Sequence, residues 1–191
     1  MTFLNAFGSA ADDPAESSAL IDYRFAAKAL HWLTAGLVFL MIACGLVMTQ
    51  LGEGPVADFL FGAHKMTGVF ILGLVIVRWL NRLVMRLRGR WIAQTGHRRI
   101  HSVLYGVIMV VPLLGWAGVS DFGARGVLFG WELPAIWPEG AGYSDGLLLA
   151  HAWLAFGLLL LVALHIGLAL EDYIMRNGAA DLAPEASSAS S

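Results

Sequence analysis

The chain has 191 residues, of which 58% are hydrophobic and only 14% are charged, and its mean hydropathy is +0.70. These values exclude an ordinary soluble globular domain and predict an integral membrane protein. The length allows one compact bundle but no second sizeable domain, and the net charge of −2 gives no reason to expect a nucleic-acid partner.

The two ends of the chain are polar and are expected to be disordered. Residues 1–22 are rich in Ala, Ser and Asp, and the first 20 carry no Lys or Arg, which argues against a cleaved signal peptide. Residues 177–191 combine Ala, Ser and Pro with two acids, a composition that buries too little apolar surface to order itself. A single domain is therefore expected over residues 23–176.

Four apolar stretches between these tails are long enough to cross a membrane, which takes about 20 helical residues. They are residues 29–52, 60–81, 100–120 and 146–170. The second stretch has a basic residue near each end, where long side chains reach the headgroups, and the other three are uncharged. Pro112 predicts a kink in the third stretch, which membrane helices tolerate. The sequence thus predicts an all-α membrane protein, a bundle of four transmembrane helices.

Lys and Arg are distributed unevenly between the two sides of the predicted bundle. Residues 78–99 alone contain seven arginines, so ten of the twelve basic residues fall on the side of both termini. Only Lys65 and Arg125 fall on the other side, where the tryptophan-bearing segment 121–145 is expected to cap the bundle. The positive-inside rule therefore predicts that both termini are cytoplasmic. The basic residues that flank the termini are Arg24, Lys28 and Arg176.

Four of the six histidines enter the spans, and they do so at two levels. His31 opens the first span on the cytoplasmic side, and His64 opens the second on the outer side. The fourth span has His151 near its outer start and His165 near its cytoplasmic end. These last two lie about 21 Å apart along the helix and within about 40° around it, so one face offers a histidine at each level. Matching by level pairs His64 with His151 and His31 with His165.

Each pair suits axial ligation of one haem iron. Two neutral imidazoles leave no open position for oxygen and favour electron transfer. Because Cys44 is the single cysteine, such haems would be b-type, without thioether links. Gly68 and Gly157 are expected to give a flat macrocycle room. Histidines in spans also act as interhelical hydrogen-bonders, proton relays or metal-transport ligands, but no Asp or Glu interrupts a span, which disfavours the two transport roles.

Other groups near the cytoplasmic level remain alternatives. His101 opens the third span at nearly the level of His31 and is the main competitor as an inner ligand. Tyr105, one turn later, is a candidate hydrogen-bonder to a quinone or a haem propionate, although an interfacial tyrosine needs no such role. His97 is expected to be a solvated loop residue. The arginines able to pair with inner propionates are Arg24, Arg78, Arg82, Arg98 and Arg99.

This arrangement resembles the prokaryotic cytochrome b561 family over nearly the whole chain, from Tyr23 to Arg176. No single motif is specific, and the order and spacing of the motifs carry the resemblance. After the second histidine of the fourth span the chain departs from the family pattern, with Glu171 and Asp172 and few basic residues. The matching segments are residues 29–33, 64–65, 78–83, 101–105, 112–116 and 129–134, together with the paired histidines of the fourth span.

The resemblance implies a multi-pass protein of the prokaryotic cytoplasmic (inner) membrane that holds two haem b groups. It also implies electron exchange with the quinone pool, with ubiquinone as the redox partner. By this resemblance, the axial ligands of the haem irons would be the same four histidines that their depth in the spans indicates. They are His31, His64, His151 and His165.

Two functional roles are open, and the resemblance implies the first. In the first, the chain is a quinone-linked electron carrier that, like some relatives, oxidises superoxide as a superoxide:quinone oxidoreductase. Lys65 and Arg125, the two outer cations, are then the candidates that attract the anion, although membrane anchoring explains them equally well. In the alternative, which the tryptophan-bearing segment 121–145 suggests as a docking surface, the chain is a membrane-anchoring cytochrome b subunit. It would relay electrons between quinone and a separate dehydrogenase, hydrogenase or soluble c-type cytochrome.

Overall fold

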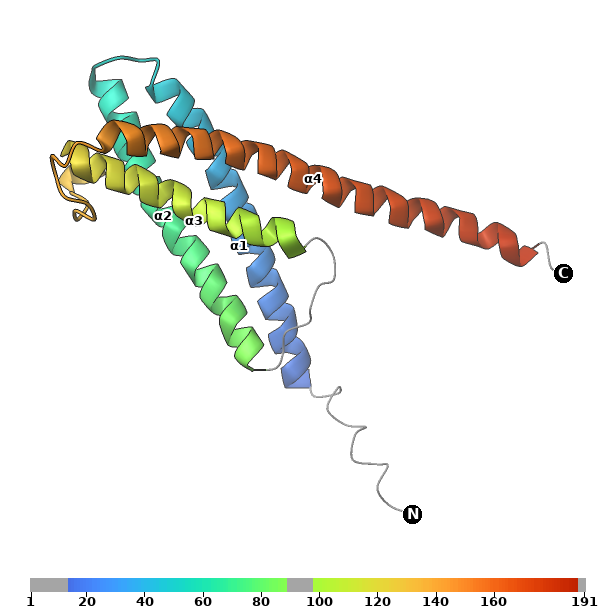
Figure 1. Ribbon diagram of the computed structural model, residues 1–191. Coiled ribbons are helices and arrows are strands. Elements are labelled where there is room, and N and C mark those ends of the chain that lie inside the picture. Colours follow the sequence, from blue (N-terminus) through green and yellow to red (C-terminus); the bar gives the residue numbers. More distant parts are fainter. Residues whose placement is uncertain (1–13, 89–97, 189–191) are drawn as a thin grey trace. The chain divides into compact units, whose positions relative to one another are not determined.

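The computed structural model describes residues 14–88 and 98–188, and the side chains of residues 25–88 and 100–175. Within this part, the chain forms four long helices and one short 3-10 helix, and no β-strand (Figure 1). It divides into two compact units, one with α1 and α2 and the other with α3 and α4. The elements are α1 (Pro14–Met48), α2 (Pro55–Leu87), α3 (Arg98–Phe122), η1 (Leu128–Gly130) and α4 (Ser144–Ser188).

Each long helix contains a stretch that is long and apolar enough to cross a membrane. The predicted all-α fold with four transmembrane helices is therefore confirmed. Pro112 lies inside α3, as expected, and α2 begins at Pro55, where a fixed φ and a missing N–H suit the first helical turn. The four stretches are Phe25–Met48, Pro55–Leu87, Ile100–Phe122 and Ser144–Met175.

Two helices continue beyond the predicted domain boundaries. α1 includes residues 14–22, and α4 includes residues 177–188, so helix is formed in part of both segments that were expected to be tails. The 45 residues of α4 span about 68 Å, more than twice the ~30 Å hydrocarbon core. Residues 1–13 and 189–191 lie outside the described residues, and the disorder of the tails stays a prediction.

The first unit is an antiparallel helix hairpin. Near its turn, the Cys44 thiol donates to the carbonyl of Leu60 at 3.7 Å, and at its other end Arg78 Nη1 donates to the carbonyl of Leu30 at 3.3 Å. Contacts thus join early residues of α1 to late residues of α2. The turn uses Gly54 with a φ of 138°, a conformation that only glycine adopts easily. This hairpin fixes His31 and His64 at opposite ends.

The second unit is also an antiparallel pair, and its helices pack closely. A Cβ added to Gly118 of α3 would lie only 2.8 Å from the side chain of Leu148 of α4. At the other end of the pair, the rings of His101 and His165 are in contact. Small residues let the two backbones approach, as is common between membrane helices.

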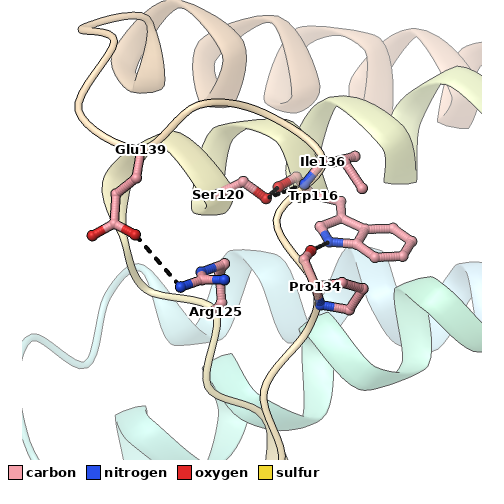
Figure 2. Close-up of polar contacts among 6 residues, drawn as sticks. All are labelled: Trp116, Ser120, Arg125, Pro134, Ile136 and Glu139. Atoms are coloured by element: carbon pink, nitrogen blue, oxygen red, sulfur yellow. Dashed lines mark hydrogen bonds and ion pairs between the residues drawn. The ribbon is translucent and has the colours of Figure 1, made fainter.

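The end of α3 holds the segment that leads to α4. Figure 2 shows Trp116 Nε1 donating to the carbonyl of Pro134 at 2.9 Å, and the Ser120 hydroxyl accepting from the backbone N–H of Ile136 at 3.4 Å. The carboxylate of the buried Asp121 accepts the backbone N–H groups of Gly142 at 3.2 Å and of Tyr143 at 2.6 Å. These bonds tie residues 134–143 to one helix end. The polar groups responsible are therefore structural.

Candidate functional site

His151 is the candidate ligand whose chemical state the geometry defines best. Its Nδ1 lies 2.8 Å from the backbone carbonyl oxygen of Val111 on α3. Because a carbonyl only accepts, Nδ1 of a neutral His151 must carry the proton and donate it. The lone pair then resides on Nε2, on the far side of the ring. A metal-binding histidine is commonly oriented by such a bond from its second nitrogen.

A glycine lies against the His151 ring. A Cβ added to Gly115 would be 3.1 Å from Cε1 of that ring, a tight contact, and 2.9 Å from Nδ1, a distance that real Cβ atoms essentially never adopt. Only a residue without a side chain therefore allows the ring to lie where it does. Val111 and Gly115 were not predicted as site residues, because the rotation of α3 relative to α4 cannot be read from hydropathy.

His64 lies against a glycine of its own hairpin in a looser way. A Cβ on Gly45 of α1 would lie 3.4 Å from Cε1 and 3.9 Å from Nδ1 of His64, which are ordinary contact distances. Gly68 and Gly157, which were expected to give a macrocycle room, do not contact a histidine in this way. A Cβ on Gly68 would lie 3.6 Å from the methyl group of Met41, and one on Gly157 would meet nothing within 4 Å. Among the glycines that the structure describes, those in contact with histidines are thus Gly45 and Gly115.

His31 has a cationic neighbour. Arg78 Nη2 lies 3.5 Å from His31 Nδ1, at the limit of a hydrogen bond, and Arg78 also donates to the neighbouring carbonyl of Leu30. An arginine only donates, so a neutral His31 in this contact accepts at Nδ1 and carries its proton on Nε2. Coordination through Nε2 therefore requires the weak contact to open. His31 differs in this respect from His151.

The predicted competitor His101 lies beside His165. Their ring centroids are 5.0 Å apart and the ring planes make an angle of 77°, an edge-to-face contact. His101 therefore lies at the same end of the α3–α4 pair as His165. Rings in direct contact leave no space for a porphyrin between them, so this arrangement does not make His101 and His165 the two axial ligands of one iron. His97 lies outside the described residues.

The two predicted outer cations have different surroundings. Arg125 Nη2 donates to Glu139 Oε2 at 3.5 Å (Figure 2), and the side chains are 27% and 61% exposed. Its charge is therefore partly offset by a neighbouring acid. Lys65 follows His64 on α2 and is half-buried. Of the two candidates, Lys65 is the one next to a predicted ligand.

His151 fits a haem ligand on the evidence of its donor chemistry. His151 presents an unprotonated Nε2 fixed by a backbone hydrogen bond, which is what an axial imidazole requires. Each predicted axial pair joins one histidine of the α1–α2 unit to one histidine of the α3–α4 unit. Both pairings stay predictions, because the contacts above lie within single units. The arginines expected to bind propionates include Arg24, Arg98 and Arg99, whose side chains lie outside the described part.

Comparisons with known proteins agree with this chemistry. The sequence model of the family described as prokaryotic cytochrome b561 matches residues 22–177. Cytochrome b561 homolog 2 of Escherichia coli (strain K12) is 26% identical over 163 residues, which cover 80% of this chain and 85% of that protein. No solved structure matches the chain. With four membrane-spanning helices and this family match over most of its length, the chain belongs to the prokaryotic cytochrome b561 family of multi-pass membrane proteins that transfer electrons through haem b.

Proposed function

We propose that this protein carries electrons across the prokaryotic inner membrane between two b haems, each held by two histidines. Ligands at the outer level are His64 and His151, and ligands at the inner level are His31 and His165. The observation that carries the proposal is the 2.8 Å hydrogen bond from His151 Nδ1 to the Val111 carbonyl, which places the proton of a neutral ring on Nδ1 and the lone pair on Nε2.

The roles of the protein groups follow from the chemistry of a six-coordinate haem. A bound haem with two imidazole ligands supplies a one-electron couple and no open site for oxygen. The histidines would hold the iron and keep its coordination unchanged when it gains or loses an electron. Trp153 and Phe156 of α4, whose ring centroids are 6.5 Å apart, would fill space between the levels as apolar packing.

Ubiquinone is the proposed redox partner, and the inner side is the side of both termini. This orientation rests on the seven arginines among residues 78–99. The acids Glu171 and Asp172, which follow His165, make the inner surface near α4 less basic than in the family pattern. Quinone contacts there would differ accordingly.

Superoxide oxidation at the outer face is a second proposed activity, and the position of Lys65 favours it. A half-buried cation directly after His64 would attract an anion towards the outer haem edge. There, superoxide would give up one electron and leave as oxygen. Because Glu139 offsets the charge of Arg125, we expect Lys65 to contribute more than Arg125.

A membrane-anchoring subunit remains the alternative role. Its support is the outer segment, where Trp131 is 75% exposed and would suit a docking surface for a soluble redox protein. Copurification of a stable dehydrogenase, hydrogenase or c-type cytochrome at native expression would favour this role. Turnover of quinone by the isolated chain would favour the carrier.

The number of haems tests the proposed function directly. Purified protein should be red, and reduced-minus-oxidised spectra with a pyridine haemochrome assay should give about two b haems per chain. A folded but colourless preparation, or one haem per chain, contradicts the proposal.

A further inference from the structure

The imidazole of His151 lies against α3 at Gly115, a position that has no side chain. Gly115 is in contact with the ring, and the carbonyl of Val111, one turn earlier, accepts its Nδ1 proton at 2.8 Å. The two contacts act on the same side of the ring. They therefore constrain both the position of the ring and its tautomer.

The space at Gly115 is too small for a side chain as long as the His151 ring keeps its position. An added Cβ at 2.9 Å from Nδ1 would push the ring away from α3 and lengthen the bond to Val111. Functional side chains need to be held within about 0.5 Å of their productive positions. The methyl group of an alanine at position 115 would thus displace His151 Nε2. It would also weaken the preference of the ring for the tautomer that carries its proton on Nδ1.

This contact is distinct from ordinary packing between the same two helices. A Cβ on Gly118, one turn away, would come 2.8 Å from atoms of the Leu148 side chain, which is as close. The neighbour there is a flexible leucine with no hydrogen bond to lose. Gly118 therefore provides a matched control for close packing without a histidine.

We infer that Gly115 and the Val111 carbonyl form a socket that positions His151 as an iron ligand. Gly115 and Val111 are positioning residues, because they act only through His151. The inference rests on the proposed function, since it assumes that His151 is an axial ligand. The inference adds a role for α3, which supplies none of the four proposed ligands. Through His151, this helix would control the ligation of the outer haem iron.

The test compares Gly115→Ala with Gly118→Ala in the full haem-loaded protein. We expect Gly115→Ala to lose or shift the low-spin electron paramagnetic resonance signal of one haem and to keep the other. Gly118→Ala should keep the resonance positions of both, even if less protein accumulates. Unchanged signals in Gly115→Ala, or equal changes in both variants, overturn the socket.

A second comparison decides the matter if Gly115→Ala does not accumulate. In His151→Gly the ring is gone, and added imidazole should restore the low-spin signal. Adding Gly115→Ala to this variant creates no clash within the chain, yet it fills the socket. The double variant should need roughly tenfold more imidazole. Equal imidazole requirements overturn the inference.

Failure of the proposed function would look different. If His151→Ala keeps two low-spin haems, His151 is not a ligand and the assignment of the outer pair is wrong. If His151→Ala loses one low-spin haem signal while Gly115→Ala neither loses nor shifts one, the ligand assignment stands and the socket alone is wrong.

Discussion

Removal of the Asp121 carboxylate should release the segment that precedes α4. This buried side chain accepts two backbone N–H groups, from Tyr143 at 2.6 Å and from Gly142 at 3.2 Å. Hydrogen bonds to a charged group contribute about 1.5–3 kcal/mol each, and water replaces part of the loss once the segment opens. We expect Asp121→Ala to lower the free energy of local opening by about 3 kcal/mol, or roughly a hundredfold in the opening equilibrium.

Amide hydrogen exchange read by mass spectrometry on the peptide that contains residues 140–144 measures this opening. Asp121→Asn keeps one acceptor oxygen and should cause roughly a tenfold increase in exchange. Glu139→Gln is the control, because its partner Arg125 is 3.5 Å away and Glu139 is largely exposed, so its exchange should change little. If Asp121→Ala exchanges no faster than Glu139→Gln, the carboxylate does not hold the segment.

Three further predictions concern the haem surroundings. Arg78→Ala should lower the midpoint potential of the inner haem by on the order of 50 mV, because a cation near His31 favours the electron-rich state; a redox titration with no shift contradicts this. Lys65→Ala should slow haem reduction by a superoxide source several-fold, and Glu139→Gln should speed it by exposing the Arg125 charge; unchanged rates in stopped-flow measurements would remove the superoxide proposal. His101→Ala should keep two low-spin haems in electron paramagnetic resonance, and loss of one of them would assign His101 as a ligand.

Hydropathy predicts the helices, and the positions of the histidines along the spans predict which of them lie at the same end. Both predictions work because a membrane restricts the chain to spanning helices. Uncharged stretches of about 20 residues have few stable alternatives to helices, and Pro112 fits inside α3 as expected. The place of His101 beside His165 also follows from depth, since the third and fourth spans run in opposite directions. These inferences need only positions along each helix.

Contacts that depend on helix rotation could not be predicted. Gly115 and Gly118 look alike in the sequence, yet one meets His151 and the other Leu148. Gly157 was favoured because it lies between two histidines, but an added Cβ there meets nothing within 4 Å. The link between Asp121 and the backbone before α4 joins residues about twenty positions apart, a distance at which sequence patterns carry no pairing information.

Electron paramagnetic resonance on the four single alanine variants of the proposed ligands would decide whether two pairs of histidines hold two haems. Each variant should lose one low-spin haem signal, through conversion to high spin or loss of the haem, and keep the other. His64→Ala and His151→Ala should affect the same haem, and His31→Ala and His165→Ala should affect the second haem. Retention of both low-spin signals in any one of the four, or a different grouping, would contradict ligation by these two pairs.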